Sequence, residues 1–179
     1  KIRAANLVSY LEHRRRSSRL ILIGEAPGYR GCHVCGIPFT SERMLLGYMP
    51  DVDHEAVFPG TKSRATRPDA PLGGNAGRQE LSASIVWRML LGAGLNARAF
   101  VLWNAFPFHP HKLHSAHTNR KPTSAELEAT CDVLPEMRAL FPGRVRVVAV
   151  GRVAEGALRK LGIAAPSVRH PAQGGAKKF

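Results

Sequence analysis

The stretch LILIGEAPG, residues 20–28, decides the fold class. Its first four residues are aliphatic, and a short run of this kind is typical of a strand buried on both faces of a parallel sheet. Similar runs occupy residues 99–103 and 145–150, and a weaker one, interrupted by Pro166, occupies 165–169. Helical patterns separate these runs. Alternation of buried strands with helices predicts an α/β domain with a parallel sheet.

The helical patterns have clear ends in two places. Thr123 and Glu126 have the spacing of a capping box at the start of a helix, and Gly162 follows the last helical residue as a C-cap glycine. Ile85 and Met89 stand at helical spacing and indicate the buried face of another helix. The expected helices cover residues 6–16, 79–91, 123–140 and 153–161.

Two segments fit neither pattern. Residues 49–75 are rich in Pro, Gly, Asp and Arg, and residues 106–122 contain four histidines. Both exceed the usual length of a loop in a compact domain, so each is either functional or mobile. Neither a repeat nor a linker divides the chain, which predicts a single domain over residues 1–179.

Charge gives the first indication of a partner. The 179 residues carry 26 Lys and Arg against 13 Asp and Glu, a formal net charge of +13. No acidic residue lies between Glu80 and Glu126, and none follows Glu155. A surface of this kind attracts polyanions, nucleic acid above all. The alternative is a basic composition shared across the source proteome, which would say nothing of a partner.

The apolar content and the number of cysteines indicate the cellular compartment of the protein. Apolar residues make up 44% of the chain, and no run approaches the ~18 apolar residues of a membrane span. No charged-then-apolar leader is visible, and three cysteines do not suit a disulfide framework. We expect a cytoplasmic protein associated with the bacterial nucleoid, without a membrane partner.

Polar side chains follow three of the expected strands directly. Glu25, Asn104 and His170 stand just beyond the strands at 20–23, 99–103 and 165–169. Because ligands of open parallel sheets bind beyond the carboxyl ends of the strands, we expect these side chains to converge on one crevice.

Each of these residues has a functional and a structural interpretation. Glu25 could hold a water molecule or cap a turn. Asn104 could pair with a base edge or cap a turn, and His170 could donate to an oxyanion or lie satisfied at the surface. Phe39 could stack on a flipped base or pack in the core. Gly174 and its neighbouring glycine suit a loop whose backbone contacts phosphate.

The cysteines raise the possibility of a metal site. Cys32 and Cys35 have the spacing of a metal knuckle, with Cys131 or histidines of 106–122 as further ligands. A second close pair of cysteines is missing, and Cys131 falls on the expected packed side of the helix at 123–140. Because the chain has only half of the usual ligand pattern, we expect neither a metal nor a cofactor.

Four motifs in order resemble the uracil-DNA glycosylase superfamily. They are GEAPG at 24–28, GIPFTSE at 36–42, WNAFPFHPH at 103–111 and VRHPAQGG at 168–175. The first is most similar to the thermophile-type (family 4) branch. The resemblance implies a three-layer α/β/α sandwich with a four-stranded parallel sheet. It further implies a monomeric, monofunctional enzyme that initiates base excision repair on DNA without a cofactor.

The resemblance also implies roles for residues. Asn104 would read the uracil edge, Phe39 would stack on the flipped ring, and His170 would face the carbonyl that gains charge. Glu25 and the Pro27–Gly28 backbone would lie beneath the base and sugar, and Ala26 and Gly28 would contact the base. The residues implied to contact DNA are Pro27, Gly28, Arg169, Gln173, Gly174, Lys177 and Lys178.

The chain departs from the family pattern in four places. Ala26 replaces the aspartate that holds water in the best-known branches, and Ala172 replaces a serine. Gly28 replaces the tyrosine that excludes 5-methyl bases, so hypoxanthine, xanthine or mismatched thymine are alternative substrates. With three cysteines, the iron–sulfur cluster of family 4 is not expected. The Ala26 and Ala172 departures also leave open a DNA-binding relative that has lost catalysis.

Overall fold

The computed structural model describes residues 2–59, 64, 66, 73–172, 174 and 175. These residues form a four-stranded sheet of order β2-β1-β3-β4, in which every neighbouring pair is parallel. The parallel α/β sheet predicted from the apolar runs is therefore confirmed. The strands are β1 (Leu20–Gly24), β2 (Phe100–Asn104), β3 (Arg146–Val150) and β4 (Ser167–Val168).

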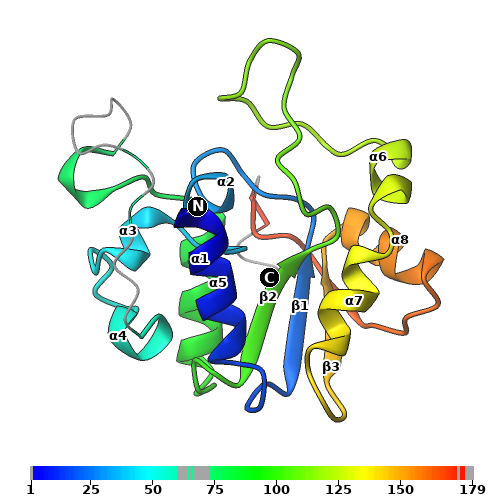
Figure 1. Ribbon diagram of the computed structural model, residues 1–179, viewed down its shortest axis with the longest axis horizontal. Coiled ribbons are helices and arrows are strands. Elements are labelled where there is room, and N and C mark those ends of the chain that lie inside the picture. The colour runs from blue at the N-terminus through cyan, green and yellow to red at the C-terminus, as the bar shows by residue number, and fades with distance from the viewer. Residues whose placement is uncertain (1, 60–63, 65, 67–72, 173, 176–179) are drawn as a thin grey trace.

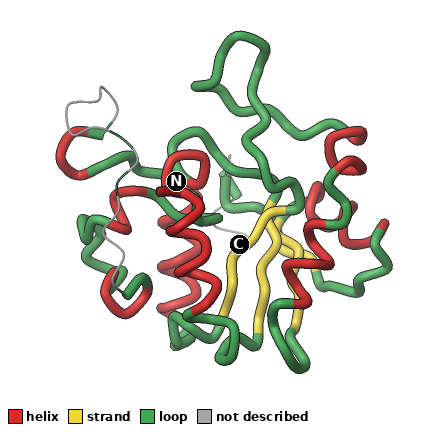
Figure 2. The backbone as a smooth tube through the Cα atoms, viewed as in Figure 1, coloured by secondary structure: helices red, strands yellow, loops and turns green. Residues whose placement is uncertain are grey.

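Helices cover both faces of this sheet. In Figures 1 and 2, α5 lies on one side of the strands, and α7 and α8 lie on the other, which gives the three layers that the resemblance implies. The described residues form a 3-10 turn, η1 (Gly74–Ala76), and the helices α1 (Ile2–Glu12), α2 (Cys32–Cys35), α3 (Glu42–Leu45), α4 (His54–Val57), α5 (Leu81–Gly92), α6 (Ser124–Ala129), α7 (Val133–Ala139) and α8 (Arg152–Lys160).

Aromatic rings join the N-terminal helix to the edge of the sheet. Tyr10 of α1 contacts Phe58, Phe58 contacts Trp87, and Trp87 contacts Phe100 of β2, with ring centroids 6.1, 5.7 and 5.2 Å apart. The Tyr10 hydroxyl also accepts a hydrogen bond of 2.8 Å from the backbone N–H of Leu102. This bond satisfies a donor on an edge strand that would otherwise be buried and unpaired.

The buried face of α5 differs from the sequence expectation. Met89 is 38% exposed and Ile85 is only partly buried, whereas Val86, Trp87 and Leu90 lie in the core. The helix reads LSASIVWRMLLG, which is apolar nearly all round. Periodicity therefore could not distinguish its faces, and packing of the Trp87 ring decides the orientation.

The expected helix over 123–140 is wrong, because the chain forms two helices there. Thr123 and Glu126 make the predicted capping box, but α6 ends at Ala129 and α7 begins at Val133. Pro135 explains the break: inside a longer helix its ring would clash with the carbonyl four residues earlier, whereas the first turn of α7 tolerates it. Cys131 consequently lies in a partly exposed turn rather than on a packed helix face.

Other boundaries shift by a few residues. The first helix begins at Ile2 and ends at Glu12, four residues ahead of the expected range at each end. Arg14 beyond it is fully buried and donates to the carbonyls of Tyr10, Val57 and Ala97. Gly162 adopts a φ of 66° just after α8 and ends that helix as expected. Among the described helices, none is long and apolar enough to cross a membrane.

Candidate functional site

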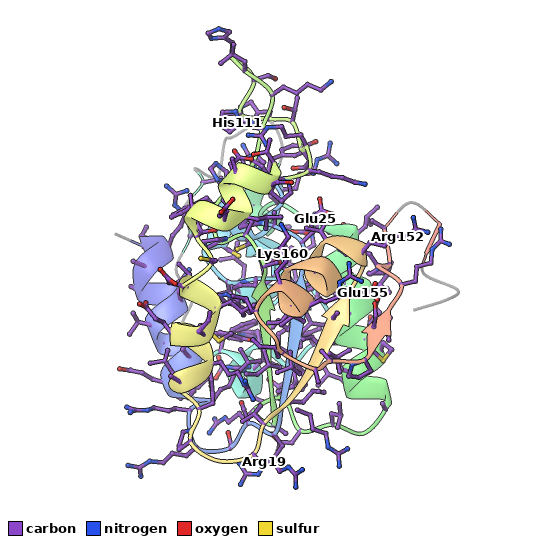
Figure 3. The ribbon with its side chains drawn as sticks, turned by 90° about the vertical axis from the view of Figure 1, so that its right-hand side faces the viewer. Arg19, Glu25, His111, Arg152, Glu155 and Lys160 are labelled. Carbon is purple, nitrogen blue, oxygen red and sulfur yellow. The ribbon has the colours of Figure 1, made fainter. Side chains whose placement is uncertain are left out.

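The strand ends bring three loops to one edge of the sheet. Gly24 and Asn104 are paired in the register of β1 and β2. Gly151, which follows β3, donates its N–H to Val168 of β4, and a Cβ on Gly151 would lie 3.1 Å from the Cβ of His170. Figure 3 shows Glu25 at this edge and Arg19 at the opposite end of the strands. The carboxyl edge therefore collects the polar residues that follow the strands.

Phe39 and Asn104 meet over Gly24. A Cβ on Gly24 would lie 2.3 Å from the Phe39 ring and 2.9 Å from Oδ1 of Asn104. Both side chains are thus in contact with the Gly24 backbone, and only glycine leaves room for them. Asn104 is 4% exposed, and its side-chain amide has no hydrogen-bond partner within the described part of the chain. A buried amide without a protein partner is available to a ligand.

The backbone at Phe39 is held in an unusual conformation. Its φ is 50°, in the left-handed region, which costs an L-residue with a bulky side chain roughly 1–3 kcal/mol. The indole N–H of the fully buried Trp87 donates to the Phe39 carbonyl at 2.8 Å. This bond, made from α5, supports the conformation that lays the Phe39 ring over Gly24.

His170 lies beside Phe39 with its donor nitrogen defined. The two ring centroids are 6.0 Å apart and the ring planes differ by 32°. The backbone N–H of Ala172 donates to Nδ1 of His170 at 3.1 Å, so the neutral ring carries its proton on Nε2. Burial lowers the pKa of His170 below its usual value. The site therefore holds a neutral imidazole with an Nε2–H donor.

The turn after His170 is compact. Gly175 approaches so closely that a Cβ there would lie 1.9 Å from the His170 carbonyl oxygen, and its N–H donates to Ala172 at 3.1 Å. The contact to Nδ1 comes from the backbone of Ala172, so it does not require the serine hydroxyl that this chain lacks. Gly174 and Arg169 are exposed, whereas Gln173, Lys177 and Lys178 lie outside the described residues.

Glu25 also lies at this edge of the sheet. Its side chain is partly buried, and burial raises the pKa of the carboxyl while Lys121 lowers it. The Glu25 carbonyl accepts a hydrogen bond of 3.0 Å from Phe106, which ties the first motif to the loop after β2. Neither Ala26 nor Gly28 is joined by a recorded contact to Phe39, Asn104 or His170, so their roles stay predictions.

The comparisons with known proteins agree with this architecture. The model of the uracil DNA glycosylase superfamily matches residues 12–177. The chain belongs to this superfamily. A comparison with curated proteins finds no match.

One solved structure is similar in fold to this chain. The crystal structure of wild-type SMUG2 from Pedobacter heparinus matches with a TM-score of 0.56 and 19% sequence identity. The match covers 86% of this chain and 65% of the Pedobacter chain, so this chain spans under two thirds of that neighbour. At this identity the likeness concerns the fold.

The sequence analysis assigned no role in this region to two residues, Glu80 and His109, that contact the loop after β1. Glu80 lies beneath the first motif, where a Cβ on Gly31 would come within 1.5 Å of Oε2, and burial raises the pKa of its carboxyl. His109 places its ring nitrogens 2.8 and 3.1 Å from the carbonyl oxygens of Pro27 and Ala116. Neither residue belongs to a strand end, so position in the sequence gave no signal for Glu80, and the WNAFPFHPH motif gave only a weak one for His109.

The cysteines have a packing role in the described structure. Cys32 and Cys35 are buried, and burial raises the pKa of both thiols. The Cys35 S–H lies 3.1 Å from the carbonyl oxygen of Thr40, its acceptor. Over the residues with defined positions, no three His, Cys, Asp or Glu side chains gather in a metal-binding arrangement.

Two cavities lie away from the strand-end residues. One of about 410 Å³ is lined by Arg30, Arg43 and Gln79, among others, next to the first motif. The other, of about 490 Å³, contains Arg15, Arg16 and Arg98. Neither is lined by Phe39, Asn104 or His170. The arginine lining of both suits anionic ligands rather than a neutral base.

Proposed function

We propose that this protein is a monofunctional DNA glycosylase that flips uracil out of DNA and hydrolyses its N-glycosidic bond. The arrangement of Phe39, Asn104 and His170 around the ends of β1, β2 and β4 is the observation that carries the proposal. It brings together the Phe39 ring, a planar amide without a partner among the described residues, and a neutral N–H donor at one edge of the sheet. These are the groups that a pyrimidine with adjacent carbonyl and N–H groups needs.

Binding begins with extrusion of the nucleotide. A base inside a duplex is out of reach, and flipping it costs a few kcal/mol. Stacking of the base on Phe39 would return ~1–3 kcal/mol. Basic side chains and backbone amides on phosphates offset the rest, in keeping with the net charge of +13. Asn104 can then exchange two hydrogen bonds with the uracil edge.

The chemical step separates charge. When the C1′–N1 bond breaks, its electron pair leaves with uracil, and the sugar becomes cationic. His170 Nε2–H and the Asn104 amide donate to the carbonyl oxygens of the uracil anion. One preorganised donor of this kind is worth about 2.7–4 kcal/mol. Water then bonds to C1′, and its proton passes to solvent or to the leaving base.

Glu25 is the candidate for orienting that water, since Ala26 has no polar side chain. Its carboxyl lies on the same edge as the reacting bond in this proposal. Burial raises the pKa of this carboxyl, and Lys121 opposes that shift. Because uracil departs as a stabilised anion, the reaction depends less on a general base that activates the water. The scheme needs no cofactor. A monomer acting on DNA near the nucleoid is the setting that we expect.

A related candidate function is removal of another base. Gly28 carries no side chain, and the atoms nearest to a Cβ there would be those of the Glu80 carboxyl, at 3.5 Å. A chain without a bulky group at this position has no evident means of rejecting a 5-methyl group. Hypoxanthine, xanthine and mismatched thymine are therefore the alternative substrates.

A panel of labelled oligonucleotides tests both candidates. Uracil in a single strand, opposite G and opposite A is compared with the three alternative bases by single-turnover release and alkaline cleavage. We expect uracil to be released fastest, and Asn104→Ala to abolish most of that release. A faster rate on another base would favour the related candidate. Salt-sensitive binding without release of any base would favour a DNA-binding relative.

A further inference from the structure

The segments that precede the strands meet at the edge of the sheet opposite to the candidate site. Figure 1 shows the connections from α1 to β1, from α5 to β2 and from α7 to β3 at the lower end of the strands, and Figure 3 labels Arg19 there. The Arg19 N–H donates to the Ala99 carbonyl at 2.8 Å, and the Arg146 N–H donates to the Arg19 carbonyl at 3.0 Å. These bonds join the starts of β2, β1 and β3. The proposed reaction uses no residue of this edge.

Exposed arginines gather on these three segments. Residues 13–19, 93–99 and 140–146 contain no acidic residue. We call their exposed arginines the basic pole, which consists of Arg15, Arg16, Arg19, Arg98, Arg144 and Arg146. Acidic side chains are found instead on helices such as α6 and α7. A basic composition alone does not explain why acids are missing from three separate segments that meet at one edge.

The charges of the basic pole are not neutralised by the protein. Ion pairs within the described part of the chain lie on other elements, and none of them includes an arginine of the pole. Arg14 is buried behind the pole, where burial lowers its pKa and the charge of Arg98 adds to this shift. Like charges at this edge therefore repel one another, and this repulsion destabilises the compact state. A polyanion bound there would relieve it.

Hydrogen bonds fix the backbone on which these arginines stand. The Ser17 and Ser18 hydroxyls donate to the Arg98 carbonyl at 2.7 and 3.2 Å, which joins the segment before β1 to the segment before β2. The Asn96 side chain accepts from the Arg98 N–H at 2.9 Å. Because this backbone is already ordered, binding of a ligand requires the ordering of side chains alone.

A cavity lies where the segments before β1 and β2 meet. Its volume is about 490 Å³, and it is lined by Glu12, His13, Arg15, Arg16, Ser17 and Arg98. The arginines supply guanidinium groups against the carboxylate of Glu12. Guanidinium groups bind phosphate through paired N–H donors. The cavity is therefore suited to a phosphate group.

The spread of the arginines indicates a polymer of phosphates rather than a small anion. Leu20 pairs with Phe100 on one side and with Arg146 on the other, so the starts of β2, β1 and β3 stand in a row. Neighbouring strands lie about 4.8 Å apart, so the row is about 10 Å wide. One strand of duplex DNA carries a phosphate for about every 3.4 Å of its axis, so roughly three phosphates would face the row.

We infer that the basic pole is a second DNA-binding surface, which holds the phosphates of a duplex segment separate from the one at the candidate site. The five residues of β1 separate the two edges of the sheet by about 15 Å. The edges face in opposite directions, so one straight segment does not lie on both. This surface goes beyond the proposed function and does not depend on base release. Its consequence is that one protein molecule bridges two duplexes.

Two pairs of substitutions with matched loss of charge test this surface. Arg16→Gln with Arg98→Gln, the pole pair, removes two charges from exposed side chains of the pole. Arg159→Gln with Lys160→Gln, the control pair, removes two from the exposed end of α8. Thermal unfolding checks that both variants are folded, as the exposure of these side chains leads us to expect.

Capture of a second duplex is the measurement. Lesion-free duplex fixed on beads is loaded with protein, washed, and offered a fluorescent lesion-free duplex at several salt concentrations. We expect the wild-type protein to capture the fluorescent duplex. The pole pair should capture ~10-fold less, with a salt slope smaller by about two units, and the control pair should differ from the wild type by less than about twofold.

Release of uracil separates this surface from the candidate site. The pole pair should release uracil in single turnover within about twofold of the wild-type rate, and Asn104→Ala should keep full capture even if it releases no base. No capture by the wild type would overturn the inference and leave the pole to a partner other than DNA. Equal capture by the pole pair would also overturn it, as would a loss of uracil release as large as the loss of capture, which would assign these arginines to the substrate footprint.

Discussion

Gly24→Ala should disable the site while leaving the fold in place. A Cβ at this position would lie 2.3 Å from the Phe39 ring and 2.9 Å from Oδ1 of Asn104. Carbon atoms in contact stand about 3.5–4.0 Å apart, so the ring has to move by more than about 1 Å. A displacement of this size at a reacting centre can cost ~10²-fold in rate.

The stability cost of the same change is smaller than its effect on rate. Overpacking a well-filled position costs ~1–3 kcal/mol, which a folded domain usually survives. Thermal unfolding and circular dichroism should therefore show a folded variant, and single-turnover release of uracil should fall ~10²-fold. Gly156→Ala in α8 is the matched control, since a Cβ there meets nothing within 4 Å. A Gly24→Ala protein as fast as the wild type would refute the placement of Phe39 and Asn104 in the site.

Three other predictions concern stability and reactivity. Trp87→Phe leaves the Phe39 carbonyl without its indole donor, so the free energy of unfolding should fall by ~1–3 kcal/mol in chemical denaturation, and an unchanged midpoint would contradict this. Burial lowers the pKa of His33 to about 4, so the unfolded chain takes up this proton first and stability should fall as pH drops from about 6.5 to about 4; His33→Gln should flatten that slope in pH-dependent melting. In a thiol-reagent titration of the native protein, Cys131 should react quickly and the buried Cys32 and Cys35 slowly, and three fast thiols would disprove the packing around α2.

The parallel sheet could be predicted from the sequence because its strands are short apolar runs that end at glycine or a polar residue. Glu25, Asn104 and His170 follow these runs, and the rule for parallel sheets brought them to one edge. Phe39 could be placed by resemblance alone. Its position over Gly24 depends on a positive φ and on a bond from Trp87, and neither has a signature in the sequence.

The elements that the sequence did not reveal depend on tertiary contacts. The four-residue helices α2 and α3 are too short to show a period, and the apolar surface of α5 has no distinct face. Residues 123–140 have a helical pattern throughout, yet Pro135 can be accommodated only by starting a new helix. Glu80 lies far along the chain from the glycines that it touches, so only the folded structure reveals its burial.

A double-mutant cycle on Asn104 and His170 measures the stabilisation of the departing base most directly. Single-turnover release of uracil is followed for the wild type, Asn104→Ala, His170→Ala and the double variant, with DNA affinity recorded in parallel. We expect each single change to slow release by ~10²-fold or more with little effect on affinity. Variants that release uracil at the wild-type rate would show that the amide and the imidazole take no part in the reaction.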